Sequence, residues 1–193
     1  MNEEKFNLPS SGAVRAELKR ERTKWRFWKI IKNTIYTLVI IAAIAVLITT
    51  LILPVLQIAG TSMEPTLNNG DIVVLLKTSK LEKGDLCGFT YSNKILIKRV
   101  IAMAGDTIVI DEAGTVYVNG EELEEPYITE KGLGECDIEF PFTVPENTYF
   151  LMGDHRTTSI DSRSTVIGCI PMEQIVGKLF LKVWPIKDFR LLN

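Results

Sequence analysis

Ser62, Lys98 and His155 are side chains of this sequence whose types could carry out covalent catalysis together. A serine hydroxyl is a weak nucleophile until a neighbouring base removes its proton. The usual base is histidine, and His155 is the only histidine in the chain. A lysine can take that role if the protein keeps its amine uncharged. The sequence therefore offers one candidate nucleophile, in the stretch GTSMEPTL at 60–67, and two candidate bases.

The first candidate base, His155, directly follows Asp154, so a Ser-His-Asp arrangement has to be considered. Adjacent residues in extended structure point to opposite faces, so Asp154 could not easily orient its own neighbour. A different carboxylate would be needed for that task. We keep this triad as an alternative.

The second candidate base, Lys98, lies inside a strongly apolar run, ILIKRVI at 95–101. If its side chain points inward, the ammonium loses hydration, which lowers the pKa by up to ~3–5 units when burial is complete. The neutral amine can then act as a general base. Alternation along a strand places Lys98 and Arg99 on opposite faces, so we expect only one of them to point inward. Taken alone, the spacing favours two exposed charges on an edge strand.

The elements that must position Ser62 begin with a stretch from 33 to 63 that contains no charged residue. Within it, residues 35–53 are nearly continuous Ile, Leu, Val and Ala. About 20 helical residues cross the ~30 Å hydrocarbon core of a bilayer. A secretory signal peptide would have a shorter apolar core, of ~7–15 residues, and a small-x-small cleavage site after it. We therefore expect a retained transmembrane helix at 33–56, with Pro54 marking its far end.

The distribution of charge predicts how that helix is oriented. Residues 1–32 hold nine Lys and Arg against four Asp and Glu, a net charge of +5, whereas the remainder holds 13 against 20, a net charge of −7. The positive-inside rule then places a basic tail, 1–32, in the cytoplasm and a domain, 57–193, outside it. Because the basic and aromatic stretch has this membrane explanation, we expect no nucleic-acid binding.

The portion that follows the span predicts a mainly β domain. Gly, Pro and Asn-Gly turn signals separate short apolar runs, and no stretch after Leu56 has a helical period over three turns. The runs expected to form strands are 72–76, 85–91, 95–102, 107–110, 115–118, 149–152, 164–167 and 175–184. We interpret the acidic stretch 121–130 as a solvated excursion. Apolar residues near the C-terminus, such as Phe180, Trp184 and Ile186, are expected to pack in the core, with insertion into lipid as the alternative.

The cysteines Cys87, Cys136 and Cys169 fit no zinc or redox spacing, so neither a metal site nor a cofactor is expected. Their odd count argues against a disulfide framework. Lone buried thiols are the expectation. A Cys136–Cys169 bridge is the alternative if the domain faces an oxidising side.

Several short motifs of this chain occur in the same order in bacterial type I signal peptidases, a family that the chain resembles from the apolar span to near the C-terminus. After the span they are GTSMEPTL at 60–67, GD at 70–71, KRV at 98–100 with GD at 105–106, and GDHRTTSIDSR at 153–163. The resemblance implies a membrane-anchored serine endopeptidase with a compact signal-peptidase-type β-fold. It also implies secretory preproteins as partners, with small residues at positions −3 and −1, and a lipid bilayer as the setting.

Residue by residue, the resemblance implies that Ser62 is the nucleophile and Lys98 the general base. Ser159 matches the serine whose hydroxyl helps to orient that lysine. Asp161 and Arg163 match an ion pair that supports the site without joining the chemistry. Without the resemblance, this pair would be expected at the surface, where it is worth under ~1 kcal/mol.

Met63 matches a residue that lines the substrate cleft of the family, with core filling as its alternative role. The chain also departs from the family's pattern. Gly60 stands where Gram-negative members have a serine that donates to the oxyanion, so the backbone N–H of Ser62 must serve, as the resemblance to Gram-positive members implies. His155 replaces an amide and is expected to be a bystander, and Thr158 replaces an Asn.

Two other functions stay open at this point. One is a membrane-tethered binding module whose site is degenerate. The other is a self-cleaving repressor, which resembles this catalytic fold but carries a DNA-binding headpiece and no span, so the apolar run argues against it. Asp106 and Asp154 are expected to form turns and are left out of catalysis.

Overall fold

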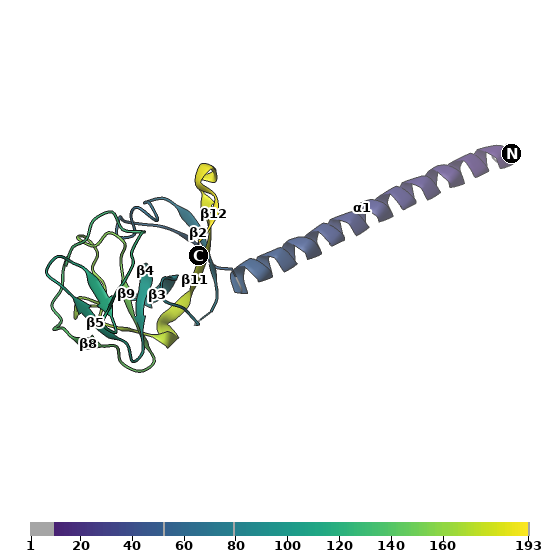
Figure 1. The fold of residues 1–193 in the computed structure, drawn as a ribbon. Helices are drawn as coiled ribbons and strands as arrows, with labels where there is room; N and C mark the ends of the chain where they lie inside the picture. The colour runs from purple at the N-terminus through teal and green to yellow at the C-terminus, as the bar shows by residue number, and fades with distance from the viewer. Residues whose placement is uncertain (1–9, 52, 79, 193) are drawn as a thin grey trace, which may run out of the picture. The chain divides into compact units, whose positions relative to one another are not determined.

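The structure is a computed structural model that describes residues 10–51, 53–78 and 80–192. The first nine residues of the expected cytoplasmic tail lie outside the described part. The chain divides after Ile48 into two compact units, of which the first is helical and the second holds the strands. Figure 1 shows the helix α1 in the first unit and the labelled strands in the second.

The helix α1 runs from Ser11 to Leu51. Residues 13–53 contain neither Gly nor Pro, the two residues that most strongly disfavour a helix interior. The segment Val14–Ile48 is long and apolar enough to cross a membrane, and its most apolar part is not buried by the rest of the chain. Because a helix of 41 residues is about 60 Å long, only part of α1 can lie in a hydrocarbon core of ~30 Å.

Both ends of this helix differ from the expectation. Residues 11–32, expected to form the cytoplasmic tail, are part of this helix. At the other end α1 stops at Leu51, and residues Val55–Gln57 form strand β1 rather than the last turn of the span. The carbonyl of Pro54 already accepts a hydrogen bond from the N–H of Leu75 at 2.9 Å, so the chain has joined the sheet at that point.

An eight-stranded antiparallel sheet forms the larger part of the second unit. Its strands follow the order β1-β2-β11-β3-β4-β9-β10, and β12 also pairs with β11. The bounds of these strands are β1 Val55–Gln57, β2 Ile72–Leu76, β3 Leu86–Tyr91, β4 Lys94–Met103, β9 Thr148–Met152, β10 Ile170–Pro171, β11 Ile175–Trp184 and β12 Arg190–Leu191.

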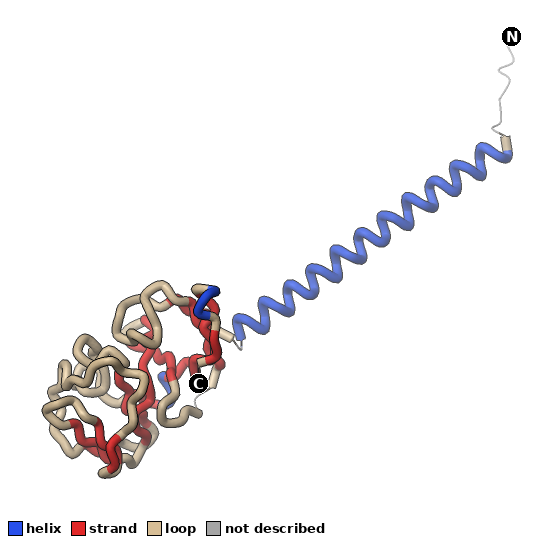
Figure 2. The backbone as a smooth tube through the Cα atoms, turned by 45° about the horizontal axis from the view of Figure 1, so that its top comes forward, coloured by secondary structure: helices blue, strands red, loops and turns tan. Residues whose placement is uncertain are grey.

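A second sheet of four strands has the order β7-β6-β5-β8. Its strands are β5 Thr107–Ile110, β6 Val116–Val118, β7 Glu121–Glu122 and β8 Phe142–Thr143. Two short 3-10 turns, η1 (Met172–Gln174) and η2 (Ile186–Asp188), complete the described elements. Figure 2 shows the second unit as strand and loop with only such short helical turns, so the expected mainly β fold is confirmed.

Three apolar clusters form the core of this unit. One joins residues of β4 and β9 to residues of β5 and β6, and so packs the two sheets together. A second holds Met63 and Leu67, from the turn after Ser62, against β2 and β11. A third lies around Phe89 and Leu151 on β3 and β9. The core therefore reaches both faces of β4, the strand that carries Lys98.

Most of the expected strands are present, and 72–76 and 107–110 match β2 and β5 residue for residue. The expected strand at 164–167 is wrong, because the chain turns there and the N–H of Ile167 donates to the carbonyl of Ser164 at 3.1 Å. The expectation that Phe180, Trp184 and Ile186 pack in the core is also wrong, since these side chains are exposed. The apolar character of these three side chains was therefore not enough to predict that they are buried.

Candidate active site

Lys98 lies in the middle of β4 and is only 4% exposed. Its Nζ donates a hydrogen bond to Ser159 Oγ at 2.9 Å. Burial lowers the pKa of this amine to about 8; the charge of Asp161 opposes that change, and the charge of Arg163 adds to it. A group with this pKa is neutral in about a tenth of the molecules at pH 7 and in about half of them at pH 8, so the amine can accept a proton.

Ser62 lies in the turn that follows β1 and is half-buried. It lines a cleft of about 550 Å³ together with Lys98. The walls of this cleft are residues 56–60 on one side and 94–98 on the other, with Met63 beside Ser62. The structure thus places the candidate nucleophile and the candidate lysine base on one cavity. Met63 both lines this cavity and, at 3% exposed, belongs to the core.

Gly153 is where the loops of Ser62 and Ser159 come together. A Cβ atom added to Gly153 would overlap the hydroxyl of Ser159 and lie 2.5 Å from the carbonyl oxygen of Ser62. That carbonyl also accepts a hydrogen bond from the N–H of His155 at 3.1 Å. Only a residue without a side chain fits between these groups. The two serines are therefore packed against the same short piece of backbone, residues 153–155.

Asp161 and Arg163 form a fully buried ion pair, not the surface pair that would be expected by default. Arg163 donates from Nε to Asp161 Oδ1 and from Nη2 to Oδ2, each at 2.8 Å. Asp161 also accepts from the N–H of Gly153 at 2.9 Å. Burial alone would raise the pKa of Asp161, but its bonds with Arg163, Gly153 and Ser159 lower it overall. This carboxylate therefore stays charged and holds the loop that carries Ser159.

Arg99 and Asp154 form a second buried pair, which the sequence did not predict. Arg99 donates from Nε to Asp154 Oδ1 at 2.8 Å and from Nη2 to Oδ2 at 2.6 Å. The hydroxyl of Thr66 donates to the same carboxylate at 2.5 Å. The expectation that only one of Lys98 and Arg99 points inward is wrong, because the core covers both faces of β4 and both residues are buried. Asp154 is an ion-pair partner and not merely a turn former.

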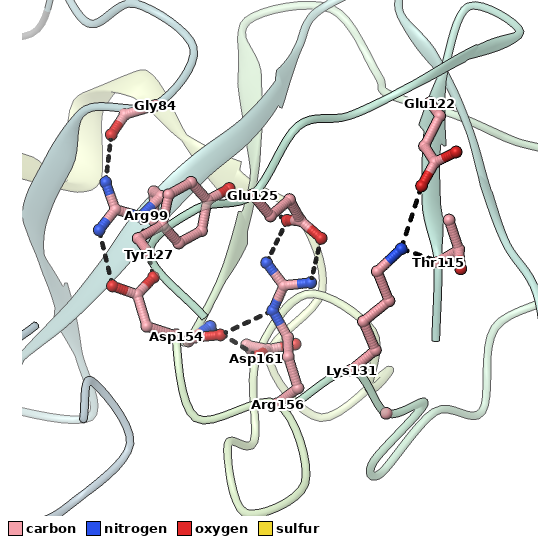
Figure 3. A network of polar contacts seen from close by, with 12 residues as sticks. Gly84, Arg99, Thr115, Glu122, Glu125, Tyr127, Lys131, Asp154, Arg156 and Asp161 are labelled. Carbon is pink, nitrogen blue, oxygen red and sulfur yellow. Dashed lines mark hydrogen bonds and ion pairs between the residues drawn. The ribbon is translucent and has the colours of Figure 1, made fainter. Parts of the chain in front are cut away.

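A third buried pair joins Arg156 to Glu125, from the acidic stretch that was expected to be solvated. Both nitrogens of the Arg156 fork donate to the Glu125 carboxylate, and the two side chains are 0% and 2% exposed. In Figure 3 the carboxylate of Glu125 faces the guanidinium of Arg156, with the ring of Tyr127 beside Arg99. The sequence does contain one indication of this burial: Pro126 and Tyr127, which directly follow Glu125, are apolar residues inside the acidic stretch.

His155 is close to the site through its backbone and not through its imidazole. Its Nδ1 is buried and makes no hydrogen bond to any residue that the structure describes. A Ser-His-Asp triad needs this nitrogen to donate to a carboxylate. The geometry therefore gives no support to the triad alternative.

Neither a cluster of metal ligands nor a disulfide is found among the described residues. Within residues 10–51, 53–78 and 80–192, no group of three or more His, Cys, Asp and Glu side chains is placed to hold a metal ion. Cys87, Cys136 and Cys169 are free thiols. Burial raises the pKa of Cys87 to about 12, so this thiol, which lies opposite Lys98 on β3, stays uncharged.

Comparison with known proteins places the chain in a family. The family model described as "Signal peptidase, peptidase S26" matches residues 31–184, which include every candidate site residue. The chain belongs to this signal peptidase family. As a member of the family, it is a peptidase whose relatives remove signal peptides.

Named relatives of this signal peptidase family member come from several bacteria. Signal peptidase I S of Bacillus subtilis is 32% identical over 168 residues, which cover 81% of this chain and 90% of that protein. Signal peptidase IB of Staphylococcus aureus is 35% identical over 153 residues, 69% of this chain and 78% of that protein. The crystal structure of a signal peptidase I from Enterococcus faecalis V583 is 27% identical and covers 52% of this chain and 97% of that one, with a TM-score of 0.44.

Proposed function

We propose that this protein is a membrane-anchored serine endopeptidase that removes signal peptides from exported preproteins with a Ser62/Lys98 dyad. The observation that carries the proposal is the buried amine of Lys98, which is hydrogen-bonded to Ser159 and lines the same cleft as Ser62. Membership of the signal peptidase family supports the reaction, and the cleft supports the choice of residues.

The pairing of buried charges supports a neutral Lys98. Each buried arginine of the described residues has its own carboxylate, and buried Lys182 lies 2.6 Å from Asp71. Lys98 makes no ion pair within 4.0 Å to any described residue, and the hydroxyl of Ser159 is its partner instead. A buried ammonium without a counter-ion is costly, so burial shifts the protonation equilibrium of Lys98 toward the uncharged amine.

The proposed reaction passes through an acyl-enzyme. Neutral Lys98 takes the proton of the Ser62 hydroxyl as the oxygen attacks the carbonyl of the last residue of the signal sequence. The resulting ammonium then gives a proton to the departing amine, and the amine of Lys98 next activates a water molecule that releases the acyl group. Ser159 holds the lysine side chain, because its Oγ accepts from Nζ at 2.9 Å.

Backbone N–H groups must stabilise the oxyanion in this scheme, since Gly60 offers no side chain. The N–H of Gly60 donates to Asn69 Oδ1 at 3.1 Å and is already engaged. The N–H of Ser62 is the donor that we assign to the oxyanion. Its position on the nucleophile itself keeps it close to the carbonyl throughout the reaction.

The proposed setting is the outer face of the cytoplasmic membrane. The basic N-terminal part of α1 and the apolar part that follows support a cytoplasmic N-terminus and an extracytoplasmic peptidase domain. Small residues at positions −3 and −1 of the preprotein are the substrate preference that the family resemblance implies.

The test is cleavage of a labelled preprotein by the full-length protein in detergent. Ser62→Ala and Lys98→Ala should each abolish cleavage, and Lys98→Arg should also fail because a guanidinium stays protonated. His155→Ala is the control and should keep most of the activity. Survival of Lys98→Ala together with loss in His155→Ala would favour the triad. A wild-type protein that cleaves nothing at any pH would favour a tethered binding module instead.

A further inference from the structure

Glu125 is a buried carboxylate in the middle of an acidic stretch that is otherwise largely exposed. Its side chain is 2% exposed, whereas its neighbour Glu124 is exposed. Burying a carboxylate is costly unless it is paired and hydrogen-bonded. The pairing found here points toward the loop of residues 153–163 and not toward the strands from which the acidic stretch emerges.

Glu125 reaches that loop through Arg156. One bond of the pair, from Arg156 Nη1 to Glu125 Oε2, measures 2.9 Å. The hydroxyl of Tyr127 donates to Glu125 Oε1 at 3.0 Å, and the Tyr127 ring lies 3.8 Å from the guanidinium of Arg99. Glu125 thus connects two arginines, of which Arg99 is the chain neighbour of Lys98 and Arg156 lies in the loop that carries Ser159. Figure 3 shows these side chains gathered in one network.

Arg156 continues the connection to the backbone that separates the two serines. Its Nε donates to the carbonyl of Gly153 at 3.1 Å. Its own carbonyl accepts from Arg163 Nη2 at 2.9 Å. Gly153 is the residue against which Ser62 and Ser159 are packed. Displacing Arg156 would therefore release one side of this contact.

The segment after Glu125 lies directly on the same loop. Arg163 donates from Nη1 to the carbonyl of Leu133 at 2.6 Å and to that of Gly132 at 3.3 Å. A Cβ atom on Gly134 would overlap the carbonyl of Arg156, so the two backbones are in contact there. The acidic stretch 121–130 and the residues 132–134 that follow thus contact the loop that carries Ser159, and Glu125 makes the charged contact.

We infer that Glu125 is a positioning residue of the peptidase site, which fixes the loop of Ser159 and Gly153 by neutralising and orienting Arg156. The inference rests on the proposed function. Glu125 acts through other residues and does not touch substrate, because the walls of the cleft are residues 56–60 and 94–98 with Ser62 and Met63. Loosening the loop should therefore lower kcat and leave KM nearly unchanged.

The loop also contributes to the burial of Lys98, through Ser159. The charged groups that act on Lys98 are Asp161, Arg163 and Asp154, and Glu125 is not among them. On β3 the residue opposite Lys98 is Cys87, an uncharged thiol. Burial is the main cause of the lowered pKa of Lys98, so water that enters through a loosened loop should raise that pKa. Loss of the Glu125 charge acts in the opposite direction, but its effect should be smaller because Glu125 is not among the charges that act on Lys98.

The experiment compares Glu125→Gln with Glu124→Gln in the full-length protein in detergent. Both changes remove one negative charge, from neighbouring positions, and only the first breaks a buried pair. For Glu125→Gln we expect kcat for preprotein cleavage to fall by about 10- to 100-fold. We expect KM to stay within about twofold of the wild type. The acid limb of the pH profile should move to higher pH, and Glu124→Gln should match the wild type throughout.

A purely structural role would lower the melting temperature and leave kcat per folded molecule and the pH profile as in Glu124→Gln, and that result would overturn the inference. If Glu125→Gln does not fold, Tyr127→Phe decides, since it removes the hydroxyl donor and keeps the ring over Arg99. For Tyr127→Phe, a fall in kcat smaller than that expected for Glu125→Gln, with the acid limb again moved to higher pH, supports the inference. An unchanged kcat and pH profile overturns it. Failure of the proposed function is a separate result, because either Lys98→Ala would then still cleave or the wild type would cleave nothing at any pH.

Discussion

Lys98 combines loss of hydration with the absence of a carboxylate partner among the described residues. The first effect lowers its pKa from 10.5 to about 8. Because the neutral amine is the active form in the proposed reaction, activity should rise with pH as the amine loses its proton. In the proposed mechanism this single side chain would therefore set the pH at which the protein works.

We expect kcat/KM for preprotein cleavage to reach a plateau above pH 8 and to fall about tenfold for each unit below that value. The measurement is the pH profile of the wild type between pH 5 and 10, with His155→Ala as the comparison. An identical acid limb in both proteins would assign the titration to Lys98. An acid limb that disappears in His155→Ala would contradict the lysine assignment.

At this scale, motif and chemistry together singled out Ser62, Lys98 and Ser159, which the structure brings to one cleft and its border. Arg99 and Glu125 could not be predicted in the same way. The alternation argument for Arg99 assumed that one face of β4 is open, and coverage by a second sheet is a property of the whole fold. Glu125 is buried by a partner, Arg156, that lies 31 positions further along the chain.

Among the elements, the loop of residues 153–163 depends on Gly153 for its closeness to the Ser62 turn. Gly153→Ala should lower kcat by about 100-fold, since its Cβ would push apart the serines that flank it. It should also destabilise the domain by about 1–3 kcal/mol through overpacking. Gly12→Ala, where α1 leaves open space, is the control and should change neither quantity. Full activity of Gly153→Ala would show that the loop can shift without cost.

The sequence predicted long strands well and short ones poorly. A run such as 175–184 holds enough residues for an apolar pattern to be distinct, and it forms β11. Strands β7, β8, β10 and β12 have two residues each, which is too few to show a period of two. The short run STVI at 164–167 was misleading, since Ser164 is buried in a turn where the N–H of Gly168 donates to its carbonyl at 2.8 Å.

On the scale of the whole molecule, all three cysteines lie in the peptidase domain and so report the side of the membrane on which it folds. Cys136 should react with a membrane-impermeant maleimide, because it is partly exposed. Cys87 and Cys169 should react much more slowly, because burial raises the pKa of Cys87 to about 12 and that of Cys169 to about 11.

If the domain is extracytoplasmic, labelling of intact cells should equal labelling after detergent is added. Cys136→Ser is the control and should remove the signal in both samples. Labelling that appears only after the membrane is dissolved would place the domain in the cytoplasm and reverse the proposed topology.

Adjacency of Lys98 and Arg99 on β4 links the folding of the domain to its chemistry. The β3–β4 ladder pairs Lys98 with Cys87 and Arg99 with Leu86. Sliding β4 by one residue would exchange the two cations, since neighbouring side chains face opposite ways. A permanently protonated guanidinium would then occupy the place of the proposed base. Under the proposed mechanism a misaligned copy would have no base and would not hydrolyse substrate, so proteolytic activity would report that β3 and β4 have paired in the correct register.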